Sequence, residues 1–577
     1  MWYRQLLICF FISFTLLVKG QTLFEDEALT RGIDATTNCD GNGLGISFAD
    51  FDNDGLDDIT VPTRNNEGLK FYKNFGGIFV EQQLLTPAIL YPTRSVSWVD
   101  YDNDGDRDLF VVSDSDGNKL FNQASDGTFS DVTISSGLFT DNVFTFSVTW
   151  GDINNDGCLD LFFSNRTTNT LFPNFLFQNN CDGTFSNISS SAGISSDSRL
   201  TFGASFFDFN NDGFQDIYLI NDKVTANRLY KNDGDGTFTD VSASTGAGIT
   251  IDAMSVTIDD YNSDGFLDIY ITNTDIQYPN RVAGNVLLQN VNGTSFSDVS
   301  SSSSTDLQGW CWGANFLDAE NDADLDLYVS CLYVSETDPD SYGFYENQTS
   351  GFSQPTNIGF LNNDLSSYGT AIGDADNNGM VDILVVNDAN NLPNLWMNKT
   401  NTTNNYLSVS LNGTTSNKDG IGSRIEISIN GEKQYRYLIN GESYISQNSF
   451  TEYFGVGAAT IVDYVKVTWL SGVVDILNNV SVNQKINITE GSTLSTANYS
   501  DNNTLAIYPN PANNRLFVNA QQQLDSIIIY NTLGQQILQL NPNSSTFDID
   551  ISGLESGIYF IKTAYNEREV TSRLIKN

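Results

Sequence analysis

The feature that most limits the fold of this chain is an acidic motif that recurs seven times. One copy reads "DFNNDGFQD", from Asp208 to Asp216, and the general form is Asp-x-Asp/Asn-x-Asp-Gly-x-x-Asp. The first positions of successive copies are separated by 50, 52, 56, 52, 58 and 56 residues. Regular spacing of this size predicts repeated structural units that are stacked or arranged in a ring.

Each motif lies between two strand-like segments. "SVSWV" is typical of the segment before it and "DLFVV" of the segment after it, and both are rich in residues that favour strands. A turn and a further strand follow, as in "DGTFTDV", where Asp-Gly is a strong hairpin signal. About four strands per repeat predict an all-β protein with a seven-bladed β-propeller over residues 24–400. An array of β-sandwiches is the alternative.

The start of the chain predicts how this ring closes. The segment Phe24–Ile33, "FEDEALTRGI", resembles the tail of a repeat but precedes the first motif. The seventh motif has no such tail, because the chain passes through "NKTNTTNN" into a different pattern. We therefore expect Phe24–Ile33 to supply the outer strand of the last blade, which would leave no open edge.

The spacing of oxygen atoms in the motif predicts a metal loop. Positions 1, 3 and 5 offer side-chain oxygens, glycine at position 6 allows a sharp turn, position 7 offers a carbonyl and position 9 a carboxylate. Six to eight hard oxygen ligands suit Ca²⁺, whereas Mg²⁺ requires stricter octahedral geometry and ranks second. Position 12 is apolar in every copy instead of Glu, so these loops join two strands and are not EF-hands.

The sequence thus predicts up to seven structural Ca²⁺ ions. The residues at positions 1, 3, 5, 7 and 9 of loops 1 to 7 are, in chain order, Asp50, Asp52, Asp54, Leu56 and Asp58; Asp100, Asp102, Asp104, Asp106 and Asp108; Asp152, Asn154, Asp156, Cys158 and Asp160; Asp208, Asn210, Asp212, Phe214 and Asp216; Asp260, Asn262, Asp264, Phe266 and Asp268; Asp318, Glu320, Asp322, Asp324 and Asp326; and Asp374, Asp376, Asn378, Met380 and Asp382. Loop 6 has Ala323 in place of glycine, which puts its turn in question. A solvated acidic surface is an alternative reading of part of this charge.

Composition excludes several classes of function. The 27 basic and 71 acidic residues give a net charge of −44, which argues against nucleic acid and against anionic membranes as partners. The chain has no histidine, so catalysis by Ser-His-Asp or Cys-His groups and His-ligated zinc are excluded. No residue is singled out as catalytic.

The N-terminus is typical of an exported protein. Residues 1–20 contain an apolar run, Leu6–Val18, that is short for a membrane span and predicts a cleaved signal peptide. An uncleaved anchor is the alternative, and no later segment is apolar enough to span a bilayer, so the mature chain is expected to have no transmembrane segment.

Export would permit disulfides among the five remaining cysteines. Cys158 and Cys181, and Cys311 and Cys331, are the closest pairs in sequence and would each lie within one repeat, which leaves Cys39 over. Spacing alone does not decide this connectivity.

The motif pattern resembles the FG-GAP or VCBS-type repeat of integrin-α-like propellers. The calcium loops carry the resemblance, together with the small-residue steps Phe202-Gly203-Ala204 and Trp312-Gly313-Ala314. The resemblance implies structural calcium sites at one end of the blades and faces that commonly bind partners. Five tryptophans lie in or beside the blade strands, where a place in the core is favoured over stacking on sugars: Trp98, Trp150, Trp310, Trp312 and Trp396.

Residues 405–490 lack acidic loops and show alternating strands. The order of "SNKDGIGSR" (416–424), "YISQNS", "FGVG" and "VTWLSG" resembles the ASPIC/UnbV domain of cartilage acidic protein-like architectures. Asp419 and Arg424 are candidates for a local ion pair. A polar linker at 491–504 is expected to follow.

Residues 505–577 form a last small β-pattern. This region resembles the type A C-terminal sorting domain of the type IX secretion system of Bacteroidetes. The motifs that carry the resemblance are Tyr508-Pro509-Asn510-Pro511, Asn531-Thr532-Leu533-Gly534 and Gly557-Ile558-Tyr559. This resemblance implies recognition by the secretion machinery and a secreted or cell-surface location. An adhesive β-module is the alternative.

The leading hypothesis is a secreted or cell-surface calcium-binding propeller that binds an extracellular glycan or protein. The alternative is a calcium-dependent polysaccharide lyase or hydrolase, and a structural matrix component is a third possibility. The sequence does not decide which face of the propeller is used.

Overall fold

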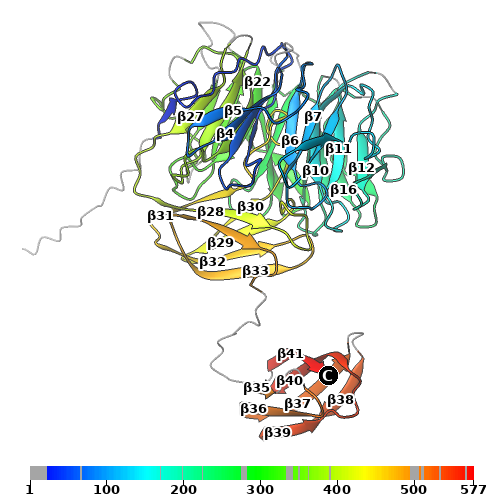
Figure 1. The fold of residues 1–577 in the computed structure, drawn as a ribbon. Helices are drawn as coiled ribbons and strands as arrows, with labels where there is room; N and C mark the ends of the chain where they lie inside the picture. The colour runs from blue at the N-terminus through cyan, green and yellow to red at the C-terminus, as the bar shows by residue number, and fades with distance from the viewer. Residues whose placement is uncertain are drawn as a thin grey trace, which may run out of the picture. The chain divides into compact units, whose positions relative to one another are not determined.

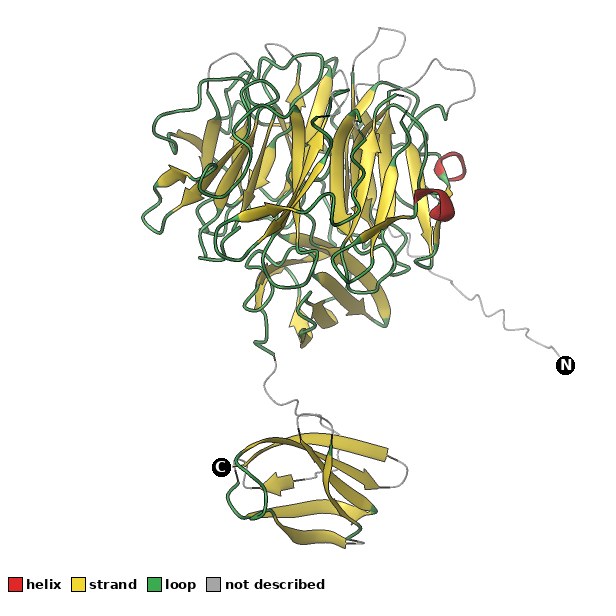
Figure 2. Ribbon diagram, turned by 90° about the vertical axis from the view of Figure 1, so that its right-hand side faces the viewer, coloured by secondary structure: helices red, strands yellow, loops and turns green. Residues whose placement is uncertain are grey.

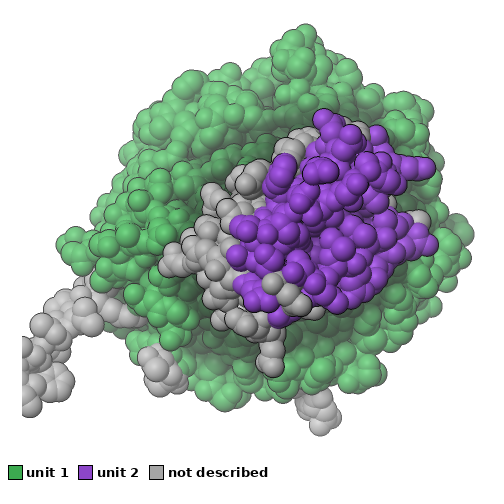
Figure 3. Space-filling model, turned by 90° about the horizontal axis from the view of Figure 1, so that it is seen from below, with its two compact units in different colours: residues 1–494 green, residues 495–577 purple. Residues whose placement is uncertain are grey.

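The computed structural model describes two compact units, residues 1–494 and 495–577 (Figure 3). Residues outside the description are 1–21, 65–67, 169–170, 198, 224, 275–281, 333–341, 349–350, 361–362, 389–390, 494–505, 509–511, 532–534, 543, 566–567 and 577. The predicted signal peptide lies outside the described residues. The same holds for most of the predicted linker and for parts of the Tyr508–Pro511 and Asn531–Gly534 motifs.

The first 400 residues form successive small antiparallel sheets, which we call blades 1 to 7 (Figures 1 and 2). The strands of blades 1 to 4 are β2 (Ser47–Ala49), β3 (Asp58–Val61), β4 (Lys70–Asn74) and β5 (Phe79–Gln82); β6 (Ser95–Val99), β7 (Asp108–Val112), β8 (Lys119–Gln123) and β9 (Phe129–Asp131); β10 (Thr145–Gly151), β11 (Asp160–Asn165), β12 (Phe175–Asn179) and β13 (Phe185–Asn187); and β14 (Thr201–Phe207), β15 (Asp216–Asn221), β16 (Arg228–Asn232) and β17 (Phe238–Asp240). Those of blades 5 to 7 are β18 (Ala253–Asp259), β19 (Asp268–Asn273), β20 (Val286–Val291) and β21 (Ser295–Asp298); β22 (Cys311–Leu317), β23 (Asp326–Cys331) and β24 (Tyr342–Tyr345); and β25 (Ser367–Gly373), β26 (Asp382–Asn387), β27 (Asn394–Asn398) and β1 (Phe24–Asp26). Two short helices, α1 (Ser242–Thr245) and α2 (Ser300–Ser303), follow blades 4 and 5.

These sheets form a closed, propeller-like ring. The first strand of each blade lies beside the first strand of the next, and β25 returns to β2. Strand β1 pairs antiparallel with β27, with Phe24 opposite Asn398, so the predicted closure by the N-terminal segment is confirmed. The all-β prediction is also confirmed.

Burial falls from the axis of the ring to its rim. All residues of the inner strands β10 and β22 are buried, whereas the outer strand β9 exposes most of its length. The residue five places before each metal loop is glycine or serine in all seven repeats, because neighbouring inner strands approach closely there. A Cβ atom on Gly313, for example, would lie 2.6 Å from the carbonyl oxygen of Tyr368.

One side-chain amide per blade ties that blade to the preceding one. An amide at the end of the third strand donates from its side chain to the carbonyl of loop position 2 in the preceding blade, as Asn232 does to Ile153 at 2.8 Å. In blade 5 this amide is the next-to-last residue of the strand, and in blade 6 it lies just beyond the strand. Asn74 joins blade 1 to Ala375 of blade 7 at 2.8 Å and so completes the circle. The seven donors are Asn74, Gln123, Asn179, Asn232, Asn290, Asn347 and Asn398.

Removing one of these amides should destabilise the ring. We expect Asn232→Ala to lower the free energy of unfolding by about 1–3 kcal/mol, because the buried Ile153 and Gln215 carbonyls both lose their donor. The exposed Asn180→Ala is the matched control and should change stability by less than about 0.5 kcal/mol. Equal melting temperatures for the two variants, measured by calorimetry, would contradict the role of the amide.

The second part of the first unit packs against the end of the ring where the metal loops lie (Figure 1). It consists of two sheets. Strands β31 (Glu452–Gly457), β28 (Asn405–Asn412) and β34 (Gln484–Thr489) form one, and β30 (Glu432–Tyr437), β29 (Arg424–Ile429), β32 (Ile461–Thr468) and β33 (Val474–Ser481) form the other. We call residues 404–493 the cap domain.

A segment of the cap domain, residues 440–448, occupies the centre of the ring, and we call it the plug. The Gln447 side chain, for example, accepts a hydrogen bond from the Trp98 N–H at 2.8 Å and donates to the Trp98 carbonyl at 2.7 Å. The plug hydrogen-bonds to an inner strand of every blade, through Phe48, Trp98, Thr149, Ser205, Val256, Ala314 and Ile372. No pattern in the sequence predicted this role.

The tip of the plug lies in a ring of repeated side chains. The residue six places before each loop joins one apolar cluster or lies against it: Leu44, Arg94, Phe146, Phe202, Met254, Trp312 and Tyr368. Tyr444 is fully buried among them, with its ring centroid 4.9 Å from that of Trp312 and 5.6 Å from that of Phe202. The predicted core role of the tryptophans holds for four of the five, since Trp310 is 41% exposed.

The two disulfides are those of the closest cysteine pairs. Cys158–Cys181 joins loop 3 to the turn after β12, and Cys311–Cys331 joins β22 to β23. Cys39 is a buried free thiol. Each closed loop of about 20 residues should add roughly 3 kcal/mol to stability.

The second unit is a small β-sandwich. One sheet contains β35 (Ala506–Tyr508), β36 (Arg515–Leu524) and β39 (Ser544–Asp550), and the other contains β38 (Gln536–Leu540), β37 (Ser526–Asn531), β40 (Gly557–Tyr565) and β41 (Arg568–Lys576). Side chains from both sheets share one apolar cluster, including Leu516, Ile529 and Ile561. Among the described residues of the whole chain, no helix has the length and apolar character of a membrane span.

Candidate metal centres

The seven acidic loops share one backbone conformation. In each, the carboxylate at position 1 accepts the N–H groups of positions 5 and 6, as Asp100 does from Asp104 at 3.0 Å and from Gly105 at 2.8 Å. Positions 4 and 6 have positive φ in all seven loops. The chain therefore curls around the side-chain oxygens, as the prediction requires.

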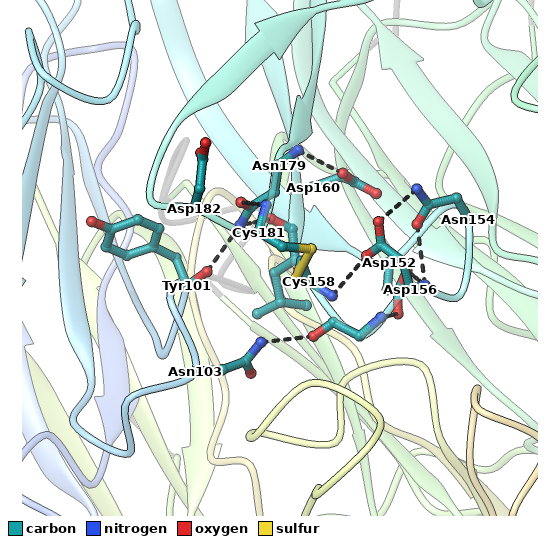
Figure 4. Close-up of a disulfide and its surroundings, with 12 residues drawn as sticks. Tyr101, Asn103, Asp152, Asn154, Asp156, Cys158, Asp160, Asn179, Cys181 and Asp182 are labelled. Atoms are coloured by element: carbon teal, nitrogen blue, oxygen red, sulfur yellow. Dashed lines mark hydrogen bonds between the residues drawn. A yellow bond between two sulfur atoms is a disulfide. The ribbon is translucent and has the colours of Figure 1, made fainter.

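The carboxylate at position 9 fastens the loop to the blade. Asp160 accepts the N–H of Ile153, at loop position 2, at 2.9 Å and that of Asn179, in the third strand, at 2.8 Å (Figure 4). The bond to the third strand, or to its extension in blade 6, recurs in all seven loops, with Asn74, Gln123, Asn179, Asn232, Asn290, Asn347 and Asn398 as donors. Position 9 thus has a structural role in addition to its predicted ligand role.

The structure brings carboxylates of positions 1, 3 and 9 together. In loops 1, 2 and 7 their oxygens lie within 4.8 Å of one another, in the groups Asp50, Asp52 and Asp58; Asp100, Asp102 and Asp108; and Asp374, Asp376 and Asp382. The position 5 side chain instead accepts the N–H of position 7, as Asp104 does from Asp106 at 3.0 Å. In loop 1 the Lys73 ammonium group contacts the Asp52 carboxylate and lies 3.0 Å from the Asp54 carboxylate. These oxygens therefore already bind a positively charged group.

Loops 3 to 5 carry asparagine at position 3. The Asn154 side chain accepts the Asp156 N–H at 3.2 Å and donates to the Asp156 carboxylate at 2.8 Å (Figure 4). A further group of acidic and sulfur side chains, Asp156, Cys158 and Cys181, is no metal site, because its two sulfurs form the disulfide.

Position 4 links five of the seven loops to the next loop, a contact that was not predicted from the sequence. Asn103 in its left-handed conformation donates to the Gly157 carbonyl at 2.8 Å (Figure 4). The same bond recurs from Asn53, Asn103, Asn155, Asn211 and Asn321. The loops therefore form a hydrogen-bonded chain around much of the ring.

Loop 6 keeps the common turn despite its alanine. Ala323 adopts φ +83°, and its N–H still donates to Asp318 at 2.8 Å, so the doubt about this turn was wrong. Burial, followed by the neighbouring Glu346 and Asp322 carboxyls, raises the pKa of Glu320 to about 8, although a hydrogen bond with Asp326 opposes the shift.

The loop carboxylates repel one another in the absence of a cation. Burial, followed by neighbouring acids, raises the pKa of Asp100 to about 7 and that of Asp260 to about 7. Burial raises the pKa of Asp108 and of Asp268 to about 9, although backbone N–H groups oppose the shift. A divalent cation would reverse these shifts, so the clustered, buried oxygens fit the predicted Ca²⁺.

The cap domain covers the loops. The carboxylate of Asp419 accepts the Asp100 N–H at 2.8 Å, and Lys485 donates to the Gly55 carbonyl at 3.1 Å. Each of the seven loops meets the cap domain, at Gly55, Asp100, Gly157, Asn211, Gly265, Asn321 and Asp374. The acidic loops therefore support the cap domain.

The expected local ion pair between Asp419 and Arg424 does not form. Asp419 instead pairs with Arg107 of the ring at 3.1 Å. Arg424 donates to the Gly265 carbonyl at 2.7 Å and lies over the Tyr435 ring. Both residues reach across the interface because the β28–β29 loop, which contains Asp419, and the first residue of β29, Arg424, face the acidic loops.

Three family models match the chain. They are an FG-GAP-like repeat at residues 64–163 and 208–271, an ASPIC and UnbV domain at 413–495, and a secretion system C-terminal sorting domain at 506–577. The chain is therefore an exported β-rich repeat protein with an ASPIC/UnbV domain, and its sorting domain directs it through the type IX secretion system to the cell surface or the extracellular space.

The relatives are cartilage acidic proteins. Cartilage acidic protein 1 of Homo sapiens is 27% identical over 263 residues, which span 40% of this chain and 38% of that protein. The protein of the same name from Xenopus tropicalis is 29% identical over 208 residues, 31% of each chain. The match thus spans less than two fifths of the length of these relatives.

Solved structures are more distant. An Agrocybe aegerita lectin that recognises non-reducing terminal N-acetylglucosamine has 16% identity and a TM-score of 0.39, over 57% of this chain and 84% of its own. A thermostable family-43 glycoside hydrolase has 13% identity and a TM-score of 0.26, over 45% of this chain and 94% of its own. TM-scores this low do not establish a common fold.

Proposed function

We propose that this chain is a calcium-stabilised extracellular binding protein whose ligand is a glycan or another protein. The observation that carries the proposal is that the acidic loops support the cap domain. The carboxylate at position 9 is fully buried in every loop, and those at positions 1 and 9 accept backbone N–H groups, which suits metal ligands and not catalytic acids or bases. Calcium at these loops would offset their mutual repulsion and hold the blades and the cap domain together.

This arrangement limits where a ligand binds. The loop end of the ring is covered by the cap domain, and the plug occupies its centre. The remaining surface is the rim and the opposite end, where Trp310 is exposed just before β22. The proposal therefore assigns ligand binding to these two regions.

Binding and catalysis are separated by one pair of measurements. The full chain in Ca²⁺ is applied to glycan and extracellular protein arrays, and the same glycans are assayed for new reducing ends and unsaturated products. Retention without product, lost when the metal is chelated, is the expected result. Product formation would instead establish the lyase or hydrolase alternative, and the absence of any ligand in either assay would contradict the binding function.

A further inference from the structure

A cavity of about 470 Å³ opens between blades 5 and 6, at the rim of the loop end. Its volume lies within the range of about 300–1,000 Å³ that is typical of small-ligand sites. We call it the blade 5–6 pocket, lined among others by Tyr261, Gln289, Ser302, Gln348, Gly351 and Phe352. No residue of the cap domain lines it.

The pocket exists because blade 6 is built differently at its rim. The described part of blade 6 has three strands, whereas the other blades have four. Beyond β24, a single bridge between Glu346 and Ser353 takes the place of the fourth strand. The described residues Gln348 and Gly351, between the two bridged residues, line the pocket together with Ser302 and Ser303 of α2.

The chemistry of the lining is unusual for so acidic a protein. Among the lining residues Asp324 is the single acid, and none is Lys or Arg. The other polar lining groups are amides and hydroxyls, from Asn262, Ser263, Gln289, Ser302, Ser303, Asn347 and Gln348. Such groups both donate and accept hydrogen bonds without selecting an ion.

Several of these groups have capacity to bind a ligand. The side-chain amides of Gln289 and Gln348 make no hydrogen bond within the described part of the chain. The Asn262 amide nitrogen is buried and makes no hydrogen bond of normal geometry there, in contrast to its counterparts Asn154 and Asn210, which bond to the position 5 carboxylate.

Aromatic rings complete the lining. The half-buried Tyr261 packs on the buried Phe352, with ring centroids 5.7 Å apart, and the exposed part of Tyr261 gives apolar surface beside the amides. An apolar ring surface next to neutral donors and acceptors suits a pyranose ring, which has C–H groups on its faces and hydroxyls around its edge.

We infer that the blade 5–6 pocket binds a neutral saccharide. This inference rests on the proposed binding function and names a ligand class and a site for it. Acidic saccharides are disfavoured, because the pocket offers no basic side chain and the surrounding charge is strongly negative.

The test uses the full chain loaded with Ca²⁺. Neutral oligosaccharides of hexoses and N-acetylhexosamines are titrated by calorimetry, beside uronate oligosaccharides. We expect binding of a neutral sugar, weakened about tenfold or more in the variant with both Gln289→Ala and Gln348→Ala. That loss corresponds to about 1.4 kcal/mol or more. The matched control is Gln178→Ala, at the same strand position in blade 3, which should bind as the wild type does.

A second variant fills the pocket instead of emptying it. Ser302→Trp, on the exposed side of α2, should abolish sugar binding without changing the melting temperature. Undiminished neutral-sugar binding by both variants would overturn the site while leaving the proposed function intact. A preference for uronates, or no saccharide binding by the wild type, would overturn the inferred ligand class.

Discussion

Removal of calcium is expected to lower the melting temperature of the first unit, and to lower it more at pH 8 than at pH 5. The loop carboxylates are buried close together, so the metal-free folded protein holds protons that the unfolded chain releases. The pKa values of Asp100, Asp58 and Asp108 are raised to about 7, 8 and 9.

The sign follows from linkage. The pKa of such an acid is higher in the folded protein, about 7–9 here, than in the unfolded chain, where it is near 4. As the pH rises through this interval, the free energy of unfolding of the metal-free protein falls. Each unit of difference corresponds to about 1.4 kcal/mol per group. Calcium requires the ionised form, so the metal-bound protein should gain stability over the same interval.

Calorimetry with Ca²⁺ or EDTA at pH 5, 6, 7 and 8 measures both trends. Asp104→Asn, at position 5 of loop 2, should reduce the stabilisation by calcium, whereas Asp126→Asn, in the exposed β8–β9 turn, should leave it unchanged. Identical melting with and without EDTA at every pH would contradict a structural role for calcium.

Replacing Tyr444 with alanine is expected to lower the free energy of unfolding by about 3–5 kcal/mol. This is the cost typical of truncating a large, fully buried aromatic side chain. Tyr444 is fully buried against residues of the ring, including Phe202 and Trp312. The cavity left behind would lie where residues of several blades converge, so no single blade can close it.

Tyr444→Phe is the matched control. It keeps the ring and loses the hydroxyl that donates to the Asn42 carbonyl, so we expect a loss of about 0.5–1.5 kcal/mol. Urea unfolding followed by tryptophan fluorescence distinguishes the two variants. Wild-type stability in Tyr444→Ala would mean that the plug fills the ring without stabilising it.

The conformation of the metal loops could be predicted from the sequence because it is local. Each loop spans nine residues, and its hydrogen bonds join residues a few positions apart, such as Asp100 and Gly105. The ring closure at Phe24 could also be predicted, because a missing tail and a surplus tail occur in one repeating pattern. The interblade amides recur in all seven repeats, and asparagine recurs at position 4 in six of the seven loops, so both features are also visible in the repeat pattern.

The plug and its covering domain could not be predicted in this way. Gln447 bonds to Trp98 and to Ile46, hundreds of residues away, and it belongs to no repeat. The expectation for Asp419 and Arg424 was wrong for the same reason, because their partners come from the metal loops and not from their own neighbourhood.

The sequence by itself determined the repeat, the acidic loops, the β-class and the C-terminal sorting domain, since each depends on residue types at short, fixed spacings. The tertiary structure alone decided that a segment of the cap domain fills the centre of the ring, that the acidic loops are covered, and that blade 6 opens a pocket. These features depend on surfaces that meet only after the chain has closed on itself, where burial and unsatisfied hydrogen-bonding groups, and not local pattern, select the partners.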